Sequence, residues 1–539
     1  MTANPPALSG LTTSLPFGNV RYGEDEMTAN FKSRTLFVAD NLPVMRGMNS
    51  ESVDLIATDP PFNTKRIHNA PLGSRTAQQR YDDRWKWDEV TDEWQDLIAA
   101  DYPVIKEIIE AAAVIEGGSI DHRTGKISTG RIKNSIAAYI AWMAPRVIEM
   151  YRLLKPTGSL YLHCDPAANS YLRLLLDSVF GRPKFRSEII WRRSNAHNKE
   201  ARQYGPIHDT ILFYSKSDKH TFHPGTRPYA KAYIDDRFKK SDERGKWQTN
   251  YLTGPEVRHG ESGKPWGGFD PTKAGRHWAI SKSIKKFLPD NGKGMTSLEM
   301  LDALHEKGLI IFPKKKGGQP MYKQYVGDGV LYQDIWAYQP NTRGVLYNSV
   351  ENIDEDVKWI ENENEKANWT TQKPIGVYRR IIESSSNEND MVLDPFCGCA
   401  TTCAAAEILG RQWVGIDIDP VAETETKDRL SDITSLDPSG VLVRKSRIKR
   451  TDIPHISDQK MRVSLWEKQG RQCANPYCDS EQVRSVDLDL DHRIPKIRGG
   501  DDDIHNRIGL CGNCNNRKGK KAWGLFLNEE RAKQPHPTR

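Results

Sequence analysis

Long apolar runs are missing from this 539-residue sequence. No stretch approaches the roughly 18 uncharged apolar residues that a membrane-spanning helix needs, so a membrane protein is not expected. The first residues also lack the basic start and apolar centre of a secretory signal peptide, and residues 1–30 have the composition of a polar lead-in. We find no internal repeat. These absences predict an intracellular protein in the cytoplasm.

Cysteine is scarce, with eight residues in the whole chain. Four have apolar neighbours in the sequence and are expected to be small core residues: Cys164, Cys397, Cys399 and Cys403. The other four form two close pairs near the C-terminal end of the chain: Cys473 with Cys478, and Cys511 with Cys514. In a reducing compartment this spacing favours a structural zinc site over disulfides.

Charge is concentrated in the last hundred residues. Residues 441–539 contain 21 lysines and arginines against 13 acidic residues, a net charge of +8, while the whole chain carries +7. The remainder is therefore almost neutral, at −1. A basic tail on a neutral body indicates that the tail helps to hold a polyanion, and the metal-binding spacing in the same tail favours nucleic acid.

A chain of this length exceeds one hydrophobic core and should divide into domains. The periodicity of apolar residues predicts strands near 35–40, 52–58, 159–165, 188–193, 208–215, 391–394 and 412–418, and helices near 133–154, 171–180, 375–386 and 401–409. Strands that alternate with helices predict an α/β fold with a parallel, doubly wound sheet. The expected divisions are a lead-in (1–30), a main domain (31–434) with an irregular insertion at about 220–345, a linker (435–460) and a compact tail (461–539).

A cofactor site is expected at the second half of the sheet. A strand ends at Asp394, a loop with Gly398 follows, and Thr401 opens the next helix; the following strand ends at Asp417, which can accept hydrogen bonds from ribose hydroxyls. The chain lacks a G-x-x-x-x-G-K-[ST] loop, and this turn lacks the full G-x-G-x-x-G fingerprint. A ligand with adenosine but without pyrophosphate fits better, and S-adenosylmethionine is such a ligand.

A second site is expected where the strand at 52–58 leads into Asp59, Pro60, Pro61 and Phe62. The prolines stiffen the turn and leave carbonyl groups without competing N–H donors. An acid beside a fixed carbonyl can accept both hydrogens of an exocyclic amine and so hold its lone pair towards an electrophile. Phe62 offers a face on which a base taken out of the double helix can stack.

These motifs resemble those of the β-class amino-group DNA methyltransferases, in which the catalytic motif precedes the cofactor motif. The resemblance covers about residues 30–430, through stretches such as SVDLIATDPPFNT (52–64), HDTILFYSK (208–216) and VLDPFCGCATTCAAAEILGRQWVGID (392–417). It implies a Rossmann-like, permuted methyltransferase fold with S-adenosylmethionine as cofactor. It also implies that the insertion is the target-recognition region and that the substrate is double-stranded DNA.

The resemblance also assigns roles to residues. Asp59 and the Pro60 carbonyl would bind the target amine, and Phe62 would stack on the flipped base. The cofactor would be held by Asp40, Thr371, Gln372, Lys373, Pro374, Asp394, Phe396, Gly398, Thr401 and Asp417. Ala400 stands where the family usually has a second glycine, and binding should survive this change. The Asp-Pro-Pro-Phe form favours adenine N6, while cytosine N4 stays open because the two amines are presented alike.

The tail resembles the HNH nuclease family, which implies a small ββα-metal domain. By that resemblance His492 would activate water, and Asn506 would brace its loop. Asp491 and Asn515, which replaces the family's last histidine, would hold Mg²⁺ or Mn²⁺. Zinc knuckles of this shape also serve purely as DNA grips. The four zinc ligands would be Cys473, Cys478, Cys511 and Cys514.

Three functions remain open from the sequence. The first is an adenine-specific DNA methyltransferase whose tail adds DNA affinity. The second is a single-chain restriction-modification enzyme whose tail cuts unmodified DNA, and the third is an RNA or protein methyltransferase. Neither the recognition sequence nor the oligomeric state, for which a homodimer is one option, can be derived from these residues.

Overall fold

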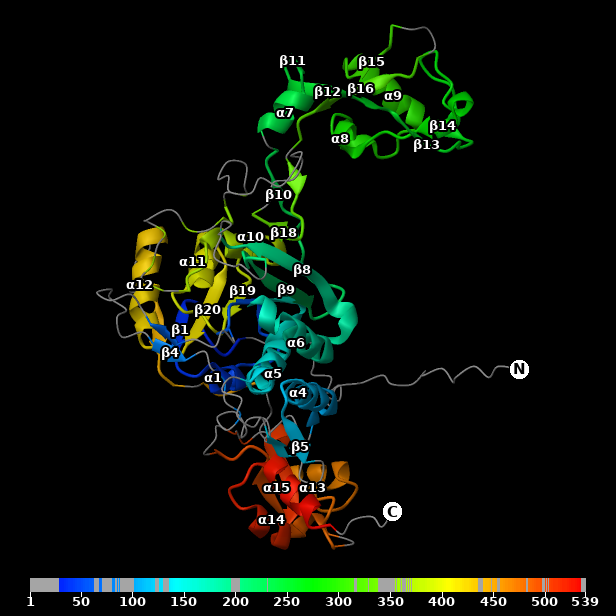
Figure 1. The fold of residues 1–539 in the computed structure, drawn as a ribbon. Helices are drawn as coiled ribbons and strands as arrows, with labels where there is room; N and C mark the ends of the chain where they lie inside the picture. The colour runs from blue at the N-terminus through cyan, green and yellow to red at the C-terminus, as the bar shows by residue number, and fades with distance from the viewer. Residues whose placement is uncertain are drawn as a thin grey trace. The chain divides into compact units, whose positions relative to one another are not determined.

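The computed structural model describes residues 29–62, 67–69, 80–82, 85, 87, 101–121, 126–128, 135–194, 204–229, 231–314, 318–327, 329–337, 354, 356–358, 360, 365, 367, 369, 371–434, 440–446, 448–452, 456–480, 483–496, 500, 502 and 504–534. The chain divides into two compact units (Figure 1). Unit 1 comprises residues 1–223, 334–337 and 354–539, and unit 2 comprises residues 224–333 and 338–353. Within the described residues, no helix is both long and apolar enough to cross a membrane.

Unit 1 is built on a nine-stranded sheet with the order β18-β8-β9-β7-β2-β19-β20-β1-β21. Its central strands are almost completely buried, as expected for a sheet that helices cover on both faces. The strands along the chain are β1 (Thr35–Val38), β2 (Val53–Thr58), β7 (Leu154–Cys164), β8 (Phe185–Arg192), β9 (His208–Ser215), β18 (Ile335–Trp336), β19 (Met391–Asp394), β20 (Gln412–Asp417) and β21 (Leu442–Arg444).

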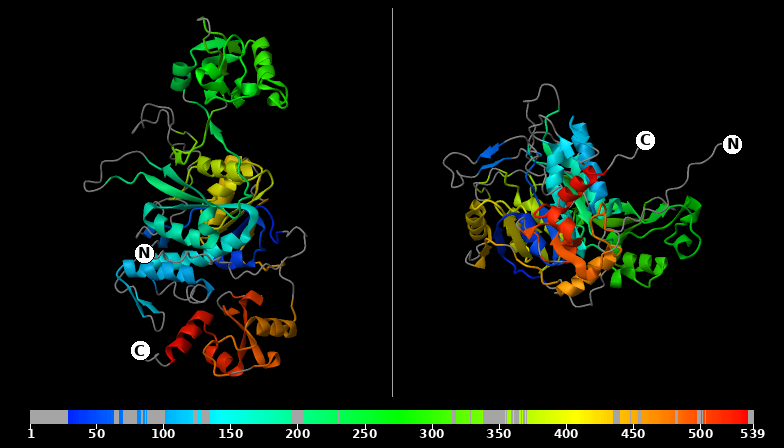
Figure 2. Two further views of the ribbon diagram at one scale, coloured as in Figure 1. Left: turned by 90° about the vertical axis from the view of Figure 1, so that its right-hand side faces the viewer. Right: turned by 90° about the horizontal axis from the view of Figure 1, so that it is seen from below.

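Two groups of helices cover this sheet on opposite sides, and they can be followed in Figures 1 and 2. One group contains α1 (Asn41–Gly47), α4 (Pro103–Ile115), α5 (Ile136–Leu153) and α6 (Pro166–Leu176). The other contains α10 (Ile375–Ser385), α11 (Thr401–Ile408) and α12 (Val421–Thr434). This arrangement confirms the predicted doubly wound α/β fold. Two small hairpins, β3 (Ile67–Asn69) with β4 (Arg80–Asp82) and β5 (Ser119–Asp121) with β6 (Lys126–Ser128), are added to the fold.

The sheet differs from the sequence prediction in strand direction. β9 runs antiparallel to both of its neighbours, β7 and β8, so the sheet is mixed and not purely parallel. An antiparallel neighbour can follow its partner through a short connection, whereas a parallel one needs a crossover.

The predicted linker also contains sheet structure. β21 lies within residues 435–460 and pairs in parallel with β1. Beyond it, Asn49 binds the chain again: its side chain accepts a hydrogen bond from the Thr451 amide at 2.8 Å and donates one to the Thr451 hydroxyl at 2.9 Å. The prediction of a plain linker was wrong because only three residues of an exposed edge strand carry the pairing.

Unit 2 is more ordered than the predicted irregular insertion. It has a four-stranded antiparallel sheet in the order β11-β12-β16-β15 and a separate hydrophobic core. The prediction failed because the main strands are largely half-exposed and their buried and exposed residues do not alternate, so they lack a clear period. The elements are β10 (Thr226–Arg227), α7 (Lys231–Arg237), β11 (Lys240–Asp242), β12 (Gly245–Tyr251), β13 (Thr253–Pro255), β14 (Arg276–Trp278), α8 (Lys282–Lys285), α9 (Ser297–Glu306), β15 (Ile310–Ile311), β16 (Met321–Tyr325) and β17 (Val330–Leu331).

The tail forms a small ββα arrangement. The hairpin of β22 (Leu488–His492) and β23 (Arg507–Cys511) is followed by α14 (Gly512–Lys518). Two further helices, α13 (Asp458–Lys468) and α15 (Trp523–Ala532), flank it. Its hydrophobic core is small and includes Cys473 and Cys514 among aromatic and aliphatic side chains. A core of this size needs additional stabilisation, which a bound metal can supply.

Candidate active site and its relatives

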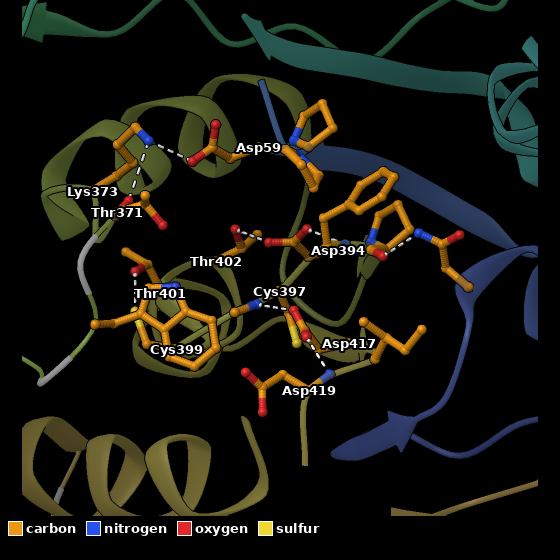
Figure 3. A pocket seen from close by; sticks show the side chains of 18 of the residues that line it. Asp59, Thr371, Lys373, Asp394, Cys397, Cys399, Thr401, Thr402, Asp417 and Asp419 are labelled. Atoms are coloured by element: carbon orange, nitrogen blue, oxygen red, sulfur yellow. Dashed lines mark hydrogen bonds and ion pairs between the residues drawn. The ribbon is translucent and has the colours of Figure 1, made fainter. Parts of the chain in front are cut away.

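Four adjacent strands bring the predicted acids together. β2, β19, β20 and β1 are neighbours in the parallel part of the sheet, so their carboxyl ends lie at one edge. Asp59, Asp394, Asp417 and Asp40 all line one pocket there. Figure 3 shows three of these carboxylates, those of Asp59, Asp394 and Asp417, around this pocket. Ligands in α/β sheets bind at this edge, so the pocket is the candidate active site.

Asp394 shapes the cofactor loop from inside. Its two carboxylate oxygens accept hydrogen bonds from the hydroxyls of Thr58 and Thr402, both at 2.6 Å. The backbone amide of Phe396 adds a third bond at 3.1 Å. Burial raises the pKa of this carboxyl to about 6. Because these bonds engage both oxygens, Asp394 fixes β2 against the loop.

The carboxylate of Asp417, at the end of β20, is held in place by two backbone amides. Gly398 donates to one oxygen and Asp419 to the other, each at 2.8 Å. Burial raises the pKa of Asp417 to about 6 as well. Each oxygen keeps a second lone pair, which suits the acceptance of hydrogen bonds from a pair of vicinal hydroxyls. Sequence reasoning missed Asp419, although it stands two residues after the predicted acid.

The loop between these acids requires a left-handed backbone twice. Gly398 has φ +50°, and a Cβ there would lie 3.1 Å from Nε1 of Trp369. Ala400 has φ +58° and is fully buried at the start of α11. Glycine adopts this region without strain, whereas alanine does not. The loop therefore holds Ala400 in a left-handed conformation that glycine would adopt without strain.

The far side of the pocket consists of aromatic and basic side chains that the sequence did not reveal. Arg146 lies over the Trp142 ring at 3.8 Å and forms an ion pair with Asp40 at 3.2 Å. Asp40 itself caps α1 through the Leu42 amide at 3.0 Å. Both Trp142 and Arg146 come from α5, whose apolar periodicity predicted only a core helix. Their positions towards the sheet edge could not be read from that period.

The Thr371–Pro374 segment reaches the pocket through its first three residues. Lys373 forms an ion pair with Asp59 at 2.5 Å, and its ammonium also donates to the Thr371 carbonyl at 3.2 Å. Gln372 binds the backbone of residues 365 and 367 and so secures the segment. Pro374 precedes α10 as its N-cap and is absent from the pocket lining, in contrast to the prediction for it.

Asp59 and Phe62 lie side by side next to the pocket. Phe62 contacts the Lys373 ammonium, 5.2 Å from its ring centroid, and the His163 ring, 5.4 Å between centroids. Asp59 follows β2 directly and is mostly buried. Pro60, Pro61, Phe396, Gly398 and Thr401 also line the pocket. An acid, a fixed turn and an aromatic face are thus grouped beside the glycine-bearing loop.

The four tail cysteines come together as predicted. The sulfur atoms of Cys473, Cys478, Cys511 and Cys514 all lie within 4.8 Å of one another. Four thiolates at this separation fit the tetrahedral coordination of zinc. Within the described residues, no other group of three or more His, Cys, Asp or Glu ligands has such a geometry. The donor set therefore supports zinc.

The remaining HNH-like residues have partners of their own. His492 contacts Asp502 at 2.9 Å, and the Asn506 amide bonds both the N–H and the C=O of Ile494. Asp491 forms an ion pair with the buried Lys518 at 2.7 Å. The fourth residue, Asn515, donates to Asp489 at 3.1 Å. Asp491 and Asn515, the two predicted ligands of a divalent cation, are thus both engaged with other side chains.

Comparison with known proteins agrees with this site. Residues 53–428 match the DNA methylase family, and residues 473–521 match the HNH endonuclease family. The Type II methyltransferase M.EcaI of Enterobacter cloacae is 30% identical over 59% of this chain and 62% of its own length. The type III restriction-modification enzyme StyLTI Mod subunit of Salmonella typhimurium is 25% identical over 72% of this chain and 52% of its own.

Among solved structures, the putative DNA modification methylase TTHA0409 of Thermus thermophilus, complexed with S-adenosyl-L-methionine, is similar with a TM-score of 0.32 and 14% identity. The match covers 76% of this chain and 98% of that one. The chain spans about three fifths and half of the two curated relatives, respectively. The family match covers most of the chain and contains both halves of the pocket, so this protein belongs to the DNA methylase family and carries an HNH region near its C-terminal end.

Proposed function

We propose that this chain transfers a methyl group from S-adenosylmethionine to the N6 amino group of adenine in double-stranded DNA. The observation that carries the proposal is the position of Asp59 and Phe62, which line the same pocket as Asp417 and the Gly398 loop. An acceptor for an amine thus lies beside a loop suited to an adenosine-bearing cofactor. The Asp-Pro-Pro-Phe form of the motif supports adenine over cytosine.

The proposed reaction depends on how this chain holds the amine. The Asp59 carboxylate and the Pro60 carbonyl each accept one N–H, which leaves the nitrogen lone pair directed towards the cofactor side of the pocket. Asp417 and the Gly398 loop would hold S-adenosylmethionine, whose methyl group would be the electrophile for this lone pair and whose sulfur would keep the electron pair of the broken C–S bond. The nitrogen then loses one proton, and Asp59 is its nearest base. S-adenosylmethionine supplies the electrophilic methyl group when bound.

The residues around the pocket fit this cofactor. Asp417 would accept the ribose hydroxyls, and the Gly398 backbone would approach the ligand closely because it lacks a side chain. Trp369 and Phe396 provide aromatic surface for the purine. Asp40, held by Arg146, offers a carboxylate to the positive end of the ligand. Trp369, Arg146 and Asp419 join the cofactor residues predicted from the sequence.

The test is nucleoside mass spectrometry on unmethylated DNA incubated with the protein, S-adenosylmethionine and EDTA. N6-methyladenine should form with the wild type, and Asp59→Ala should lose it. Asp218→Asn is the matched control, because Asp218 is a surface acid with a mostly exposed side chain. N4-methylcytosine in place of N6-methyladenine would overturn the choice of base. Methylation of RNA but not of DNA would overturn the substrate.

For the tail, we propose a zinc-stabilised module that grips double-stranded DNA. The net charge of +8 over residues 441–539 and the four clustered thiols support this role. Cleavage with Mg²⁺ or Mn²⁺ is the less favoured activity, because Lys518 already neutralises Asp491 and Asn515 binds Asp489. Cutting of unmethylated DNA that His492→Ala abolishes would reverse this preference. We also propose a cytoplasmic location, where reducing conditions preserve the thiols; a homodimer stays a prediction.

A further inference from the structure

A buried histidine outside the predicted site stands between two aspartates. His163 on β7 has a side chain only 3% exposed. Its Nδ1 lies 3.4 Å from Oδ1 of Asp59, and its Nε2 lies 3.3 Å from Oδ2 of Asp209. The ring also meets Phe62 edge to face and Trp191 in a similar way, with centroids 5.4 and 5.6 Å apart. One imidazole therefore contacts both residues proposed to hold the target base.

The register of the sheet explains this placement. β2 and β7 are parallel neighbours, and their last pair is Thr58 with Leu162. The next residues, Asp59 and His163, therefore lie beside each other just beyond that pair. On its other side, β7 pairs with β9, the strand that carries Asp209. Three strands thus fix the order Asp59, His163, Asp209 across the sheet. Because β9 runs antiparallel to β7, the prediction of a purely parallel sheet could not place Asp209 beside His163.

The charges around the imidazole are balanced on both sides. Lys373 neutralises Asp59 at 2.5 Å, and Arg193 neutralises Asp209 at 3.0 Å. Burial raises the pKa of Asp209, but His163, Lys373 and Arg193 outweigh it and leave this pKa below its ordinary value. Asp209 is therefore an anion behind the ring. Each ring nitrogen thus has a carboxylate oxygen within 3.4 Å, although neither contact has the geometry of a hydrogen bond.

Packing alone does not account for a histidine here. The rings beside it, Phe62 and Trp191, are apolar, and a phenylalanine would fill the same space without the cost of burying two ring nitrogens. The second buried acid, Asp209, adds to that cost unless the pair serves the site. We propose that His163, supported by Asp209, is a positioning residue that fixes the Asp59 carboxylate and the Phe62 ring for the target base. This inference rests on the proposed function of Asp59.

Three substitutions separate the contributions of the ring. His163→Asn keeps an N–H donor near the place of Nδ1, which faces Asp59. The second change, His163→Gln, keeps a donor near Nε2, which faces Asp209. His163→Phe keeps only the ring and its contact with Phe62. Each full-length variant is compared with wild type by single-turnover methylation of DNA, KM for DNA, S-adenosylmethionine affinity and melting temperature.

We expect His163→Phe and His163→Gln to lower the single-turnover rate about 10- to 100-fold, the scale expected when a reacting group is misplaced by about 1 Å. His163→Asn should recover most of that rate, to within about threefold of wild type, because it restores the donor to Asp59. Cofactor affinity should stay close to wild type in all three, since the ring does not line the cofactor pocket. The melting temperature shows whether a variant has lost stability, and rates are compared well below it. Rescue by asparagine but not by glutamine is a result that a purely structural role would not produce.

A His163→Phe protein with the wild-type rate would overturn the inference, and so would equal losses in the phenylalanine and asparagine variants. Asp59→Ala, measured in parallel, separates this failure from a failure of the proposed function. If Asp59→Ala is inactive while His163→Phe is fully active, only the positioning role is wrong. If Asp59→Ala is active, the proposed role of Asp59 itself is wrong.

Discussion

The buried carboxyl of Asp417 links cofactor binding to pH. Its pKa of about 6, raised by burial, leaves it mostly protonated at pH 5 and mostly ionised at pH 7.5. The ionised form accepts hydrogen bonds on both oxygens and attracts the positive charge of S-adenosylmethionine. We therefore expect affinity for the cofactor to fall by about tenfold between pH 7.5 and pH 5, in proportion to the ionised fraction. Equilibrium dialysis at a series of pH values measures this change.

The matched variant is Asp417→Asn, which cannot ionise. It should bind weakly at pH 7.5 and show little further loss at pH 5. Asp394 has a similar pKa but bonds two hydroxyls, so its titration should affect the loop more than the ligand. If Asp417→Asn keeps the wild-type pH profile, another group governs the effect.

Ala400 stores strain in the cofactor loop. Its φ of +58° places an L side chain in the left-handed region, at a cost of about 1–2 kcal/mol. Ala400→Gly should therefore raise the free energy of unfolding by about 1 kcal/mol, after some loss of buried surface and of unfolded-state entropy. Urea denaturation of the whole chain measures it. Ala405→Gly, inside α11, should instead destabilise by about 1 kcal/mol; equal signs for the two variants would contradict the argument.

Much of the site could be predicted at the residue scale. Asp59, Asp394 and Asp417 were recognisable because each follows a short apolar strand, and parallel strands end at one edge. Trp142, Arg146 and His163 could not be found in this way, since they belong to segments whose apolar pattern explains them as core. Their role depends on which strand or helix lies beside which, and spacing in the chain does not contain that information.

At the scale of elements, a few polar hydrogen bonds hold residues 451–452, which follow β21, against residues 49–50. Asn49, which is buried, bonds the Thr451 amide and hydroxyl, while the Ser50 amide bonds Asp452 at 2.8 Å. Asn49→Ala would leave the Thr451 amide without this acceptor. Thr451 is exposed, so water can replace this acceptor, and we expect a loss of about 1–3 kcal/mol in the free energy of unfolding from two hydrogen bonds of roughly 0.5–1.5 kcal/mol each. Urea denaturation measures it, and Asn169→Ala, which removes a side chain bonded only to Glu188 at 2.7 Å, is the milder comparison.

The elements that the sequence missed share a physical cause. The side chains of β21, β12 and β16 are mostly exposed or half-exposed, so neither burial nor period marks these strands. Buried strands such as β9 were predicted with the correct bounds, but the direction of β9 in the sheet was predicted wrongly. Strand direction follows from the connections in space, which a periodic pattern does not encode.

At the scale of the whole molecule, we expect the tail to contribute to DNA binding without affecting the proposed cofactor site. Removal of zinc by a strong chelator should unfold the tail, because its small core depends on the four thiolates. We expect DNA affinity to fall and its dependence on salt to become shallower, since basic contacts are lost. Cofactor affinity should not change, because none of the described tail residues lines its pocket.

The checks are metal content, DNA binding between 50 and 200 mM salt, the range over which loss of phosphate contacts is usually visible, and dialysis of S-adenosylmethionine. Cys511→Ser should reproduce the effect of the chelator. DNA binding that is unaffected by either treatment would contradict the tail's role as a DNA grip.

The strand order has a consequence for biosynthesis. β1 pairs with β20 and β21, and β2 pairs with β7 and β19, so strands made early need partners that are made more than 300 residues later. While the ribosome is still synthesising unit 2, β1 lacks both neighbours and β2 lacks one. Such open edges invite pairing with other nascent chains. Completion of the sheet therefore waits until β21, which ends at Arg444, has left the ribosome.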